Sequence, residues 1–204
     1  MRGIAELDLT GFAATEDDGV WQNAAGVFLR AGFQDSPPMS ALDSLLRDAV
    51  VGLLGSGATP MEYWIDFPGG LPAVFVLSKQ RQASGRGWEY TALYRVPRAT
   101  CSVTIELRAA EQGADIGSRE AFVLHQLGPD VIYVPRGMPV IETPEGKPIR
   151  FDYADSHGVD RMFPDHPLSQ LRAALRQAFP SVRFEEWFTA LAAGQDSQSP
   201  AGDG

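Results

Sequence analysis

The strongest pattern of apolar and polar positions lies over residues 41–54. Apolar residues recur there three and four positions apart and form a single stripe, made of Leu42, Leu45, Leu46, Ala49, Val50, Leu53 and Leu54. This spacing is that of one face of an α-helix. Ser40 suits the N-cap of such a helix, and Gly55 suits its C-terminal stop. The sequence therefore predicts an amphipathic helix over residues 41–54.

Four segments after this helix alternate between apolar and polar residues, which is the pattern of half-buried β-strands. They cover residues 61–67, 71–79, 88–96 and 101–108, and turns that contain glycine or proline separate them. The apolar face of the first segment carries Met61, Tyr63, Ile65 and Phe67. Their close succession predicts an antiparallel meander with one face on the core.

Weaker signals extend the sheet and add helices. Alternation predicts a strand over residues 4–9, and two short runs at 19–23 and 27–34 predict a hairpin. Helical spacing predicts three further helices, at 118–127 after a Ser118 cap, at 167–178 and at 182–193. A Pro- and Gly-rich excursion over 129–148, with a short strand at 131–134, connects the first two of these helices.

Together these elements predict an α+β fold in which helices flank an antiparallel sheet meander. We expect one globular domain over residues 1–193, because no repeat or linker divides this part of the chain. Residues 194–204 carry no large apolar side chain. This composition predicts a disordered C-terminal tail, since it offers nothing to bury in a core.

Composition narrows the class of protein. The 204 residues carry a net charge of −9, which argues against nucleic-acid binding, because that binding needs Lys and Arg to displace phosphate counterions. A single cysteine, Cys101, excludes an internal disulfide framework and a Cys-rich zinc site. The longest apolar run, residues 49–54, is too short for a membrane span, and the N-terminus has no signal-peptide core. We therefore expect a cytoplasmic protein with no membrane or nucleic-acid partner and no cofactor.

The order of the predicted elements is an early strand pair, one amphipathic helix, a four-strand meander and a further helix. With the strand Gly-Gly-Leu-Pro-Ala-Val-Phe-Val at residues 69–76, this order resembles the Mog1/PsbP-like fold group, which includes the DcrB-like proteins of bacteria. The resemblance covers residues 4–128. A later stretch, residues 161–172, is similar to a segment of bacterial proteins of about this length.

The resemblance implies an α/β/α sandwich and a non-enzymatic role. Members of this fold group bind other proteins, among them small GTPases, photosystem subunits and secreted effectors. The resemblance carries no binding residue over to this chain, because no binding motif of the group matches it. A fold alone does not fix a function.

The densest polar cluster of the chain lies within residues 152–166. Its candidate metal-ligating or acid–base side chains are Asp155, His157, Asp160, Asp165 and His166. Histidine and aspartate suit both roles, but their spacing matches neither the zinc-protease motif nor an EF-hand loop. The alternative interpretation is a surface loop in which Asp165 or His166 caps the helix at 167–178.

A second candidate site combines arginines with aromatic residues. It consists of Arg81, Arg86, Trp88, Tyr90 and Arg95, and the segment around it is net basic, whereas the first fifty residues are net acidic. Arginine, tryptophan and tyrosine dominate the energetic centres of protein interfaces, which indicates a protein-binding face. The alternative is an ordinary solvated sheet face whose aromatic side chains belong to the core.

These observations favour a non-catalytic bacterial protein that binds another protein, as an adaptor, a chaperone or an immunity-like protein. Binding would use the exposed sheet face or the Pro-rich segment 129–150. The alternative is a small metal-dependent or acid–base hydrolase that uses residues 152–166, whose side chains would then have to converge in a cleft. A third hypothesis is a structural homodimer, so we expect a monomer or a homodimer.

Overall fold

The computed structural model describes most of the chain. The described residues are 1–35, 42–128, 132–133, 138–139, 141–143, 146, 149 and 151–191. The predicted cap at Ser40, the predicted tail 194–204 and most of the excursion 129–148 lie outside the described residues.

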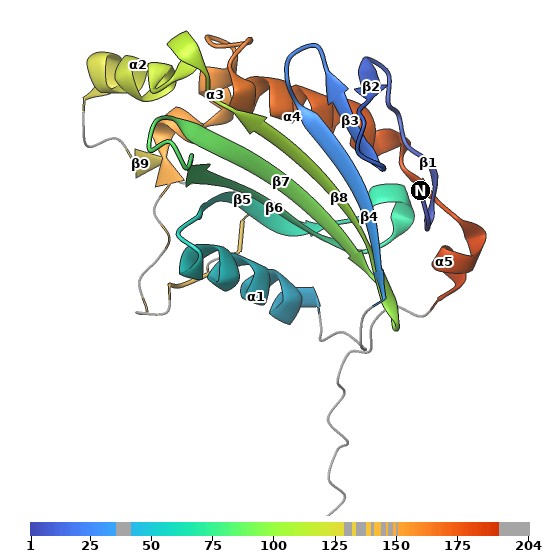
Figure 1. The fold of residues 1–204 in the computed structure, drawn as a ribbon. Helices are drawn as coiled ribbons and strands as arrows, with labels where there is room; N and C mark the ends of the chain where they lie inside the picture. Colours follow the sequence, from blue (N-terminus) through green and yellow to red (C-terminus); the bar gives the residue numbers. More distant parts are fainter. Residues whose placement is uncertain are drawn as a thin grey trace, which may run out of the picture.

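A seven-stranded sheet forms the centre of the described chain. Its strands are β2 (Phe12–Ala14), β3 (Val20–Asn23), β4 (Phe28–Asp35), β5 (Thr59–Asp66), β6 (Ala73–Arg81), β7 (Trp88–Pro97) and β8 (Cys101–Ala110). Their order in the sheet is β2-β3-β4-β8-β7-β6-β5, and every neighbouring pair is antiparallel (Figure 1). The predicted meander is therefore confirmed as β5 to β8, and the predicted hairpin as β3 and β4.

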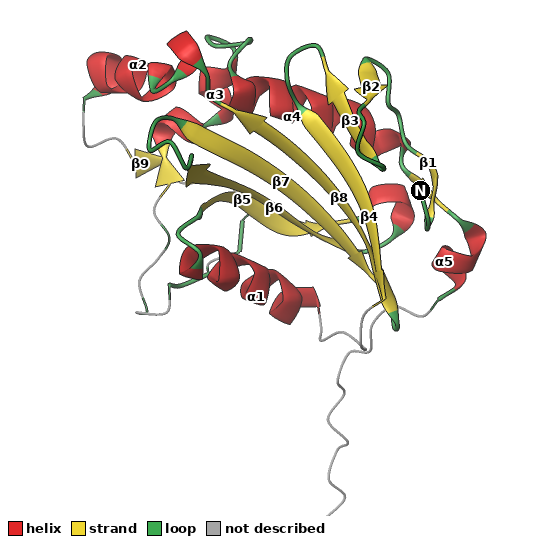
Figure 2. Ribbon diagram, in the orientation of Figure 1, coloured by secondary structure: helices red, strands yellow, loops and turns green. Residues whose placement is uncertain are grey.

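Helices cover both faces of this sheet. They are α1 (Leu42–Gly55), α2 (Ser118–Leu127), α3 (His157–Asp160), α4 (Pro167–Ala178) and α5 (Glu186–Ala190). Figure 2 shows α1 on one side of the sheet and α4 on the other; α1 packs against β5 and β6, whereas α4 packs against β8 and β7. The α+β class is thus confirmed. No helix in the described part of the chain is both long and apolar enough to cross a membrane.

Short elements join distant parts of the chain. Strand β1 (Ile4–Glu6), which is shorter than the predicted 4–9, pairs with β11 (Arg183–Phe184), and β9 (Ile132–Tyr133) pairs with β10 (Phe151–Asp152). The N-terminal strand therefore lies beside the last elements of the described chain (Figure 1). Single 3₁₀ turns occur at η1 (Pro68–Gly70), η2 (Gly113–Asp115), η3 (Tyr153–Asp155) and η4 (Phe179–Ser181).

The predicted alternation is confirmed by the side of the sheet to which each residue points. Phe75 and Leu77 of β6 enter the core that the sheet shares with α4, whereas Val74 and Val76 pack in the cluster that includes α1. Both faces of β6 are therefore buried. The larger core, on the α4 side, fixes the position of α4 over the sheet and creates the site described below.

The prediction that Met61, Tyr63, Ile65 and Phe67 share one face of β5 is wrong. A bulge between Pro60 and Glu62 interrupts the register with β6, so Met61 joins the α4-side core while Tyr63 joins the α1-side cluster. Beyond the strand, the Phe67 side chain is 62% exposed, because the chain turns there into η1. An extra residue in a strand reverses the side-chain alternation, and the apolar pattern alone does not reveal it.

Two further expectations need correction. The predicted helix 182–193 begins instead as strand β11, and α5 has five residues, because pairing with β1 holds residues 183 and 184 in an extended conformation. The N-cap of α2 is Gly117 in a left-handed conformation, and Ser118 is the first helical residue. The helix ends at Leu127, as predicted, and Gly128 is its C-cap.

Candidate functional site

Two arginines meet in a buried ionic cluster between β5, α2, α3 and α4. Arg172 donates from Nε to Oε1 of Glu62 and from Nη1 to Oδ1 of Asp160, both at 2.8 Å, and its Nη2 also donates to Glu62. Arg119 donates from Nη1 to the same Asp160 oxygen, also at 2.8 Å. The exposed fractions of Arg172 and Arg119 are 2% and 1%. We call Glu62, Arg119, His157, Asp160 and Arg172 the arginine cluster.

Backbone carbonyl groups accept further hydrogen bonds from both guanidinium groups, and the Ser169 hydroxyl accepts one more from Arg119. Arg119 donates to the carbonyl oxygens of Ala154 (2.8 Å) and Ser156 (3.0 Å), and Arg172 donates to that of Asp155 (2.6 Å). The turn that precedes α3 therefore binds two buried guanidinium groups through its carbonyl oxygens. Because a buried charge is tolerated only when it is paired and hydrogen-bonded, this arrangement fixes the turn against α4.

His157 completes the arginine cluster at its solvent side. Its Nδ1 lies 3.5 Å from Oδ2 of Asp160, and its Nε2 lies 3.4 Å from Oε2 of Glu62. Hydrogen bonding to Asp160 and then to Glu62 raises the pKa of His157 to about 9. Burial opposes ionisation of Asp160, but the hydrogen bond from His157 and the charge of Arg172 outweigh it and hold the pKa of Asp160 well below its usual range. At neutral pH His157 and Asp160 are therefore both ionised.

This ionisation predicts a pH-dependent contribution to stability. The pKa of His157 is raised from 6.5 to about 9, so its contribution is fully present below pH 6.5 and is lost as the pH rises through 9. The side chain is 55% exposed, and solvent screening reduces the expected contribution to about 1 kcal/mol.

Urea unfolding of the wild type and of His157→Gln at pH 6 and pH 10 measures this contribution. We expect the free energy of unfolding to fall by about 1 kcal/mol more in the wild type than in the variant over this interval. Equal losses in the two proteins would show that His157 is not held in its charged form by the cluster.

A second buried ion pair lies beside the arginine cluster. The Lys79 ammonium group on β6 lies 2.7 Å from Oδ2 of Asp155 and 4.8 Å from the centre of the Trp88 ring. Burial raises the pKa of Asp155 to about 6, and the charge of Lys79 partly offsets this effect. The pair attaches η3 to the sheet, and both of its side chains are buried.

A third polar centre surrounds Glu111, which follows β8. Its carboxylate accepts hydrogen bonds from the Tyr90 hydroxyl (2.7 Å) and from the backbone N–H groups of Trp88 and Gly117 (both 3.2 Å). His166 lies with Nε2 3.2 Å from Glu111, while its Nδ1 accepts the N–H of Leu168. Because Nδ1 is an acceptor, the proton lies on Nε2 and is donated to Glu111. The prediction that Asp165 or His166 caps α4 is thus confirmed for His166.

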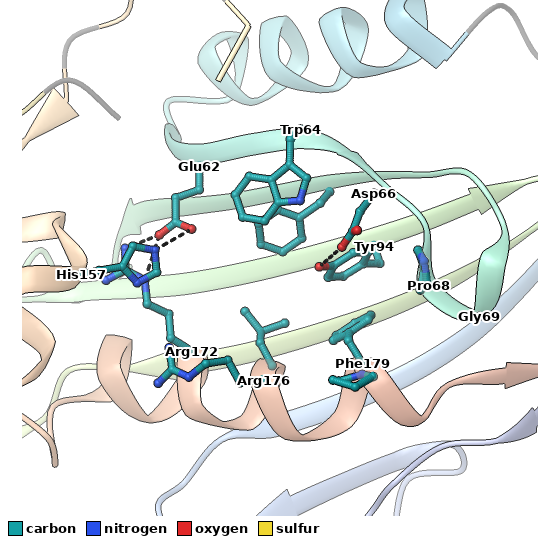
Figure 3. A pocket seen from close by; sticks show the side chains of 13 residues that line it. Glu62, Trp64, Asp66, Pro68, Gly69, Tyr94, His157, Arg172, Arg176 and Phe179 are labelled. Carbon is teal, nitrogen blue, oxygen red and sulfur yellow. Dashed lines mark hydrogen bonds and ion pairs between the residues drawn. The ribbon is translucent and has the colours of Figure 1, made fainter. Parts of the chain in front are cut away.

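A pocket of about 430 Å³ opens between the sheet and α4, next to the arginine cluster (Figure 3). Its apolar wall is a series of ring contacts, with centre-to-centre distances of 4.2 Å from Trp64 to Phe75, 4.5 Å from Phe75 to Tyr94 and 3.7 Å from Tyr94 to Phe179. Glu62, His157 and Arg172 line the charged end. The remaining lining is supplied by Asp66, Pro68, Gly69, Leu175, Arg176 and Pro180.

The structure separates the five residues of the predicted arginine and aromatic face. Tyr90 is 1% exposed and points toward α4, and Trp88 lies on that same side with the Arg81 guanidinium group 3.9 Å from its ring centre. Arg95 lies on the opposite face of β7, since neighbouring residues of a strand point to opposite sides. Arg86 is exposed in the turn that follows β6. These five residues therefore do not share one exposed face of the sheet.

The polar cluster at 152–166 is brought together only in part. His157 and Asp160 converge at the charged end of the pocket, whereas the carboxylate of Asp155 points to Lys79. His166 belongs to the Glu111 centre, and Asp165 is exposed. Within the described residues, no group of three or more His, Cys, Asp or Glu side chains is placed to hold one metal ion.

Several residues that build the site were not predicted, namely Glu62, Trp64, Asp66, Lys79, Glu111, Arg119 and Arg172. One signal was present for Arg172, because it lies on the apolar stripe that Leu168, Leu171 and Leu175 form on α4. A charged residue on the core face of a helix indicates a buried ion pair. Nothing in the sequence identifies its partner Glu62, which is 110 residues away.

No protein-family model matches this chain, and no curated protein matches it. The pocket and the three polar centres around it are therefore the features from which a function is inferred.

Proposed function

We propose that this chain is a non-catalytic protein-binding module, and that its binding site is the pocket between the sheet and α4. The observation that carries the proposal is the pairing of an aromatic wall with a fixed, fully paired ionic cluster in one cavity. Such a cavity offers shape and apolar surface to an anchor side chain of a partner. Anchors of this kind, seated in pockets, dominate the energy of protein interfaces.

The ionisation of the site supports binding over acid–base catalysis. A general acid or base is most effective when its pKa lies near the operating pH. The pKa of His157 is raised to about 9, which makes it a weak acid at neutral pH. The ionic partners of Glu62 and Asp160 keep the pKa of each carboxyl below its usual range, which makes both carboxylates weak bases. Asp155, with a pKa of about 6, is buried against Lys79 and does not line the pocket. The hydrolase alternative therefore has the weaker support.

The surface around the pocket also favours a macromolecular partner. Phe67 is an exposed aromatic residue next to Pro68, which lines the pocket. By contrast, a second cavity of about 420 Å³ on the opposite face of the sheet, beside Phe28, is lined by Glu89, Glu106 and Arg108, and Arg108 pairs with both glutamates. Charges that compensate each other on an exposed surface contribute little to binding.

The resemblance to the Mog1/PsbP-like group supports a more specific form of the proposal. In this form the chain is an adaptor, chaperone or immunity-like protein for another bacterial protein, in the cytoplasm. The pocket would receive one segment of that protein.

Affinity capture from a lysate of the cells that produce the chain tests the proposal. The immobilised wild type is compared with two pocket variants, Trp64→Ala and Leu175→Gln, and with Phe28→Ala, which alters an exposed side chain on the other face of the sheet. Circular dichroism confirms that each variant is folded.

We expect the wild type and Phe28→Ala to retain a stoichiometric protein that both pocket variants lose by at least about tenfold, which corresponds to about 1.4 kcal/mol. Capture of the same protein by all four chains, or of no protein by the wild type, would overturn the proposal.

A further inference from the structure

Some of the charged residues that line the pocket form ion pairs with one another, and others do not. Glu62, His157 and Arg172 are ion-paired inside the arginine cluster, where Glu62 and Asp160 are the carboxylates that these cations share. Arg176 is exposed in the last turn of α4, where the helix dipole favours a cation. Asp66, like Arg176, forms no ion pair with another described residue. Among the carboxylates that line the pocket, Glu62 is therefore ion-paired and Asp66 is not.

The Asp66 carboxylate is held in a fixed position. Its Oδ2 accepts the Tyr94 hydroxyl at 2.8 Å, and its Oδ1 accepts the backbone N–H of Phe67 at 2.8 Å. Burial and the nearby Asp66 charge raise the pKa of Tyr94, so its hydroxyl remains a donor. A group that is already oriented loses little entropy on binding, which makes Asp66 a stronger recognition element than the exposed side chain of Arg176.

Two aromatic residues line the pocket near this carboxylate. Trp64 lies two residues before Asp66 on β5, on the same side of the strand, and Figure 3 shows both side chains at the pocket, with the Tyr94 hydroxyl bonded to Asp66. The faces of aromatic rings attract cations, and a carboxylate beside them adds a charge-assisted hydrogen bond. This combination is selective for an organic cation with an apolar stem.

We infer that the pocket binds a Lys or Arg side chain of the partner protein, with its cationic end at Asp66 and Trp64. This inference rests on the proposed function. The aliphatic stem would pack on Leu175 and Phe179, which line the wall on the α4 side. A volume of about 430 Å³ is within the range of roughly 300–1,000 Å³ that is typical of ligand pockets. The chain's net charge of −9 would also attract a basic segment over longer distances.

Titration with three capped pentapeptides tests the inference. Each peptide has alanine at four positions and differs at its centre, which is lysine, its uncharged isostere norleucine, or glutamate. Binding is followed by NMR on the full chain, for the wild type, for Asp66→Asn and for the control Asp165→Asn, which changes an exposed aspartate outside the pocket.

We expect the wild type and Asp165→Asn to bind the lysine peptide at least about fivefold more tightly than the norleucine peptide, and the glutamate peptide least tightly. In Asp66→Asn the lysine preference should fall to less than about twofold, while binding of the norleucine peptide is kept. A lysine preference that survives in Asp66→Asn, or its absence in the wild type, would overturn the inference.

The same titration separates this inference from the proposed function. One outcome is that the wild type binds the lysine and norleucine peptides equally and that Trp64→Ala loses both. The pocket would then still be a protein-binding site, but it would have no preference for a cation. Failure of all three peptides to bind at millimolar concentration would overturn both. If free butylammonium binds as tightly as the lysine peptide, the ligand is a small amine. The inference that the cation belongs to a side chain of a partner protein would then be wrong.

Discussion

Replacing Arg172 with methionine is expected to lower the free energy of unfolding by about 3–5 kcal/mol, because a buried ion pair that loses one partner leaves an uncompensated charge behind. Arg172 is the shared partner of Glu62 and Asp160, and it also donates to the carbonyl of Asp155. Methionine fills a similar volume but supplies no hydrogen bond. The Glu62 carboxylate would then be left buried with His157 as its neighbouring cation. Urea unfolding at pH 7 measures the loss.

Arg176→Met is the matched control for this variant. Arg176 is four residues later on the same helix and is exposed, so its replacement should change the free energy of unfolding by less than about 0.5 kcal/mol. A loss below about 1 kcal/mol in Arg172→Met would contradict the assignment of the arginine cluster as a central element of the fold.

Replacing Glu111 with alanine is the second variant with a large expected effect. One carboxylate satisfies Tyr90, His166 and two backbone N–H groups, and the alanine variant leaves all four donors without this acceptor. Each buried donor that loses its partner costs about 1–3 kcal/mol, and water entering the vacated space offsets part of the sum. We expect a total loss of about 3–5 kcal/mol in the free energy of unfolding.

Glu6→Ala provides the comparison for this second variant. Glu6 is exposed on β1, and its removal should change stability by less than about 0.5 kcal/mol. If Glu111→Ala unfolds at the same urea concentration as Glu6→Ala, the Glu111 centre is not a structural junction between β7, β8 and α4. Thermal unfolding of the same pair gives an independent reading.

The sequence predicted those elements whose pattern is local. The stripe of α1 and the alternation of β7 and β8 each repeat over ten or more residues, so their boundaries came within a few residues of those in the structure. Pro167 and Ala178 are both the predicted and the observed ends of α4. Regular periodicity over such a length requires no information from the rest of the chain.

The elements that were mispredicted depend on distant partners. Residues 184, 187, 188 and 191 have helical spacing, yet β1 at the other end of the chain holds residues 183 and 184 as a strand. Tertiary pairing overrides such a short local preference. The bulge after Pro60 also depends on a distant partner, because it is defined by the register of β5 with β6.

The candidate site was predicted only in part for the same reason. The His and Asp residues of the segment 152–166 are close in sequence and were recognised as a polar cluster. Their charge partners come from β5, β6, α2 and α4, and the sequence does not indicate which distant residues meet them. The ionisation of Asp160 and His157 depends on their ion pairs with these distant residues. The local sequence therefore could not show whether the two side chains are free to exchange protons.

The central claim, that the pocket between the sheet and α4 is the binding site, is tested most directly by hydrogen exchange. Backbone amide exchange is compared between the free chain and the chain bound to its captured partner. We expect slower exchange in the complex at β5 and over residues 172–180, which line the pocket. Slowing confined to β3, β4 and the outer face of β8, with the pocket segments unchanged, would contradict it.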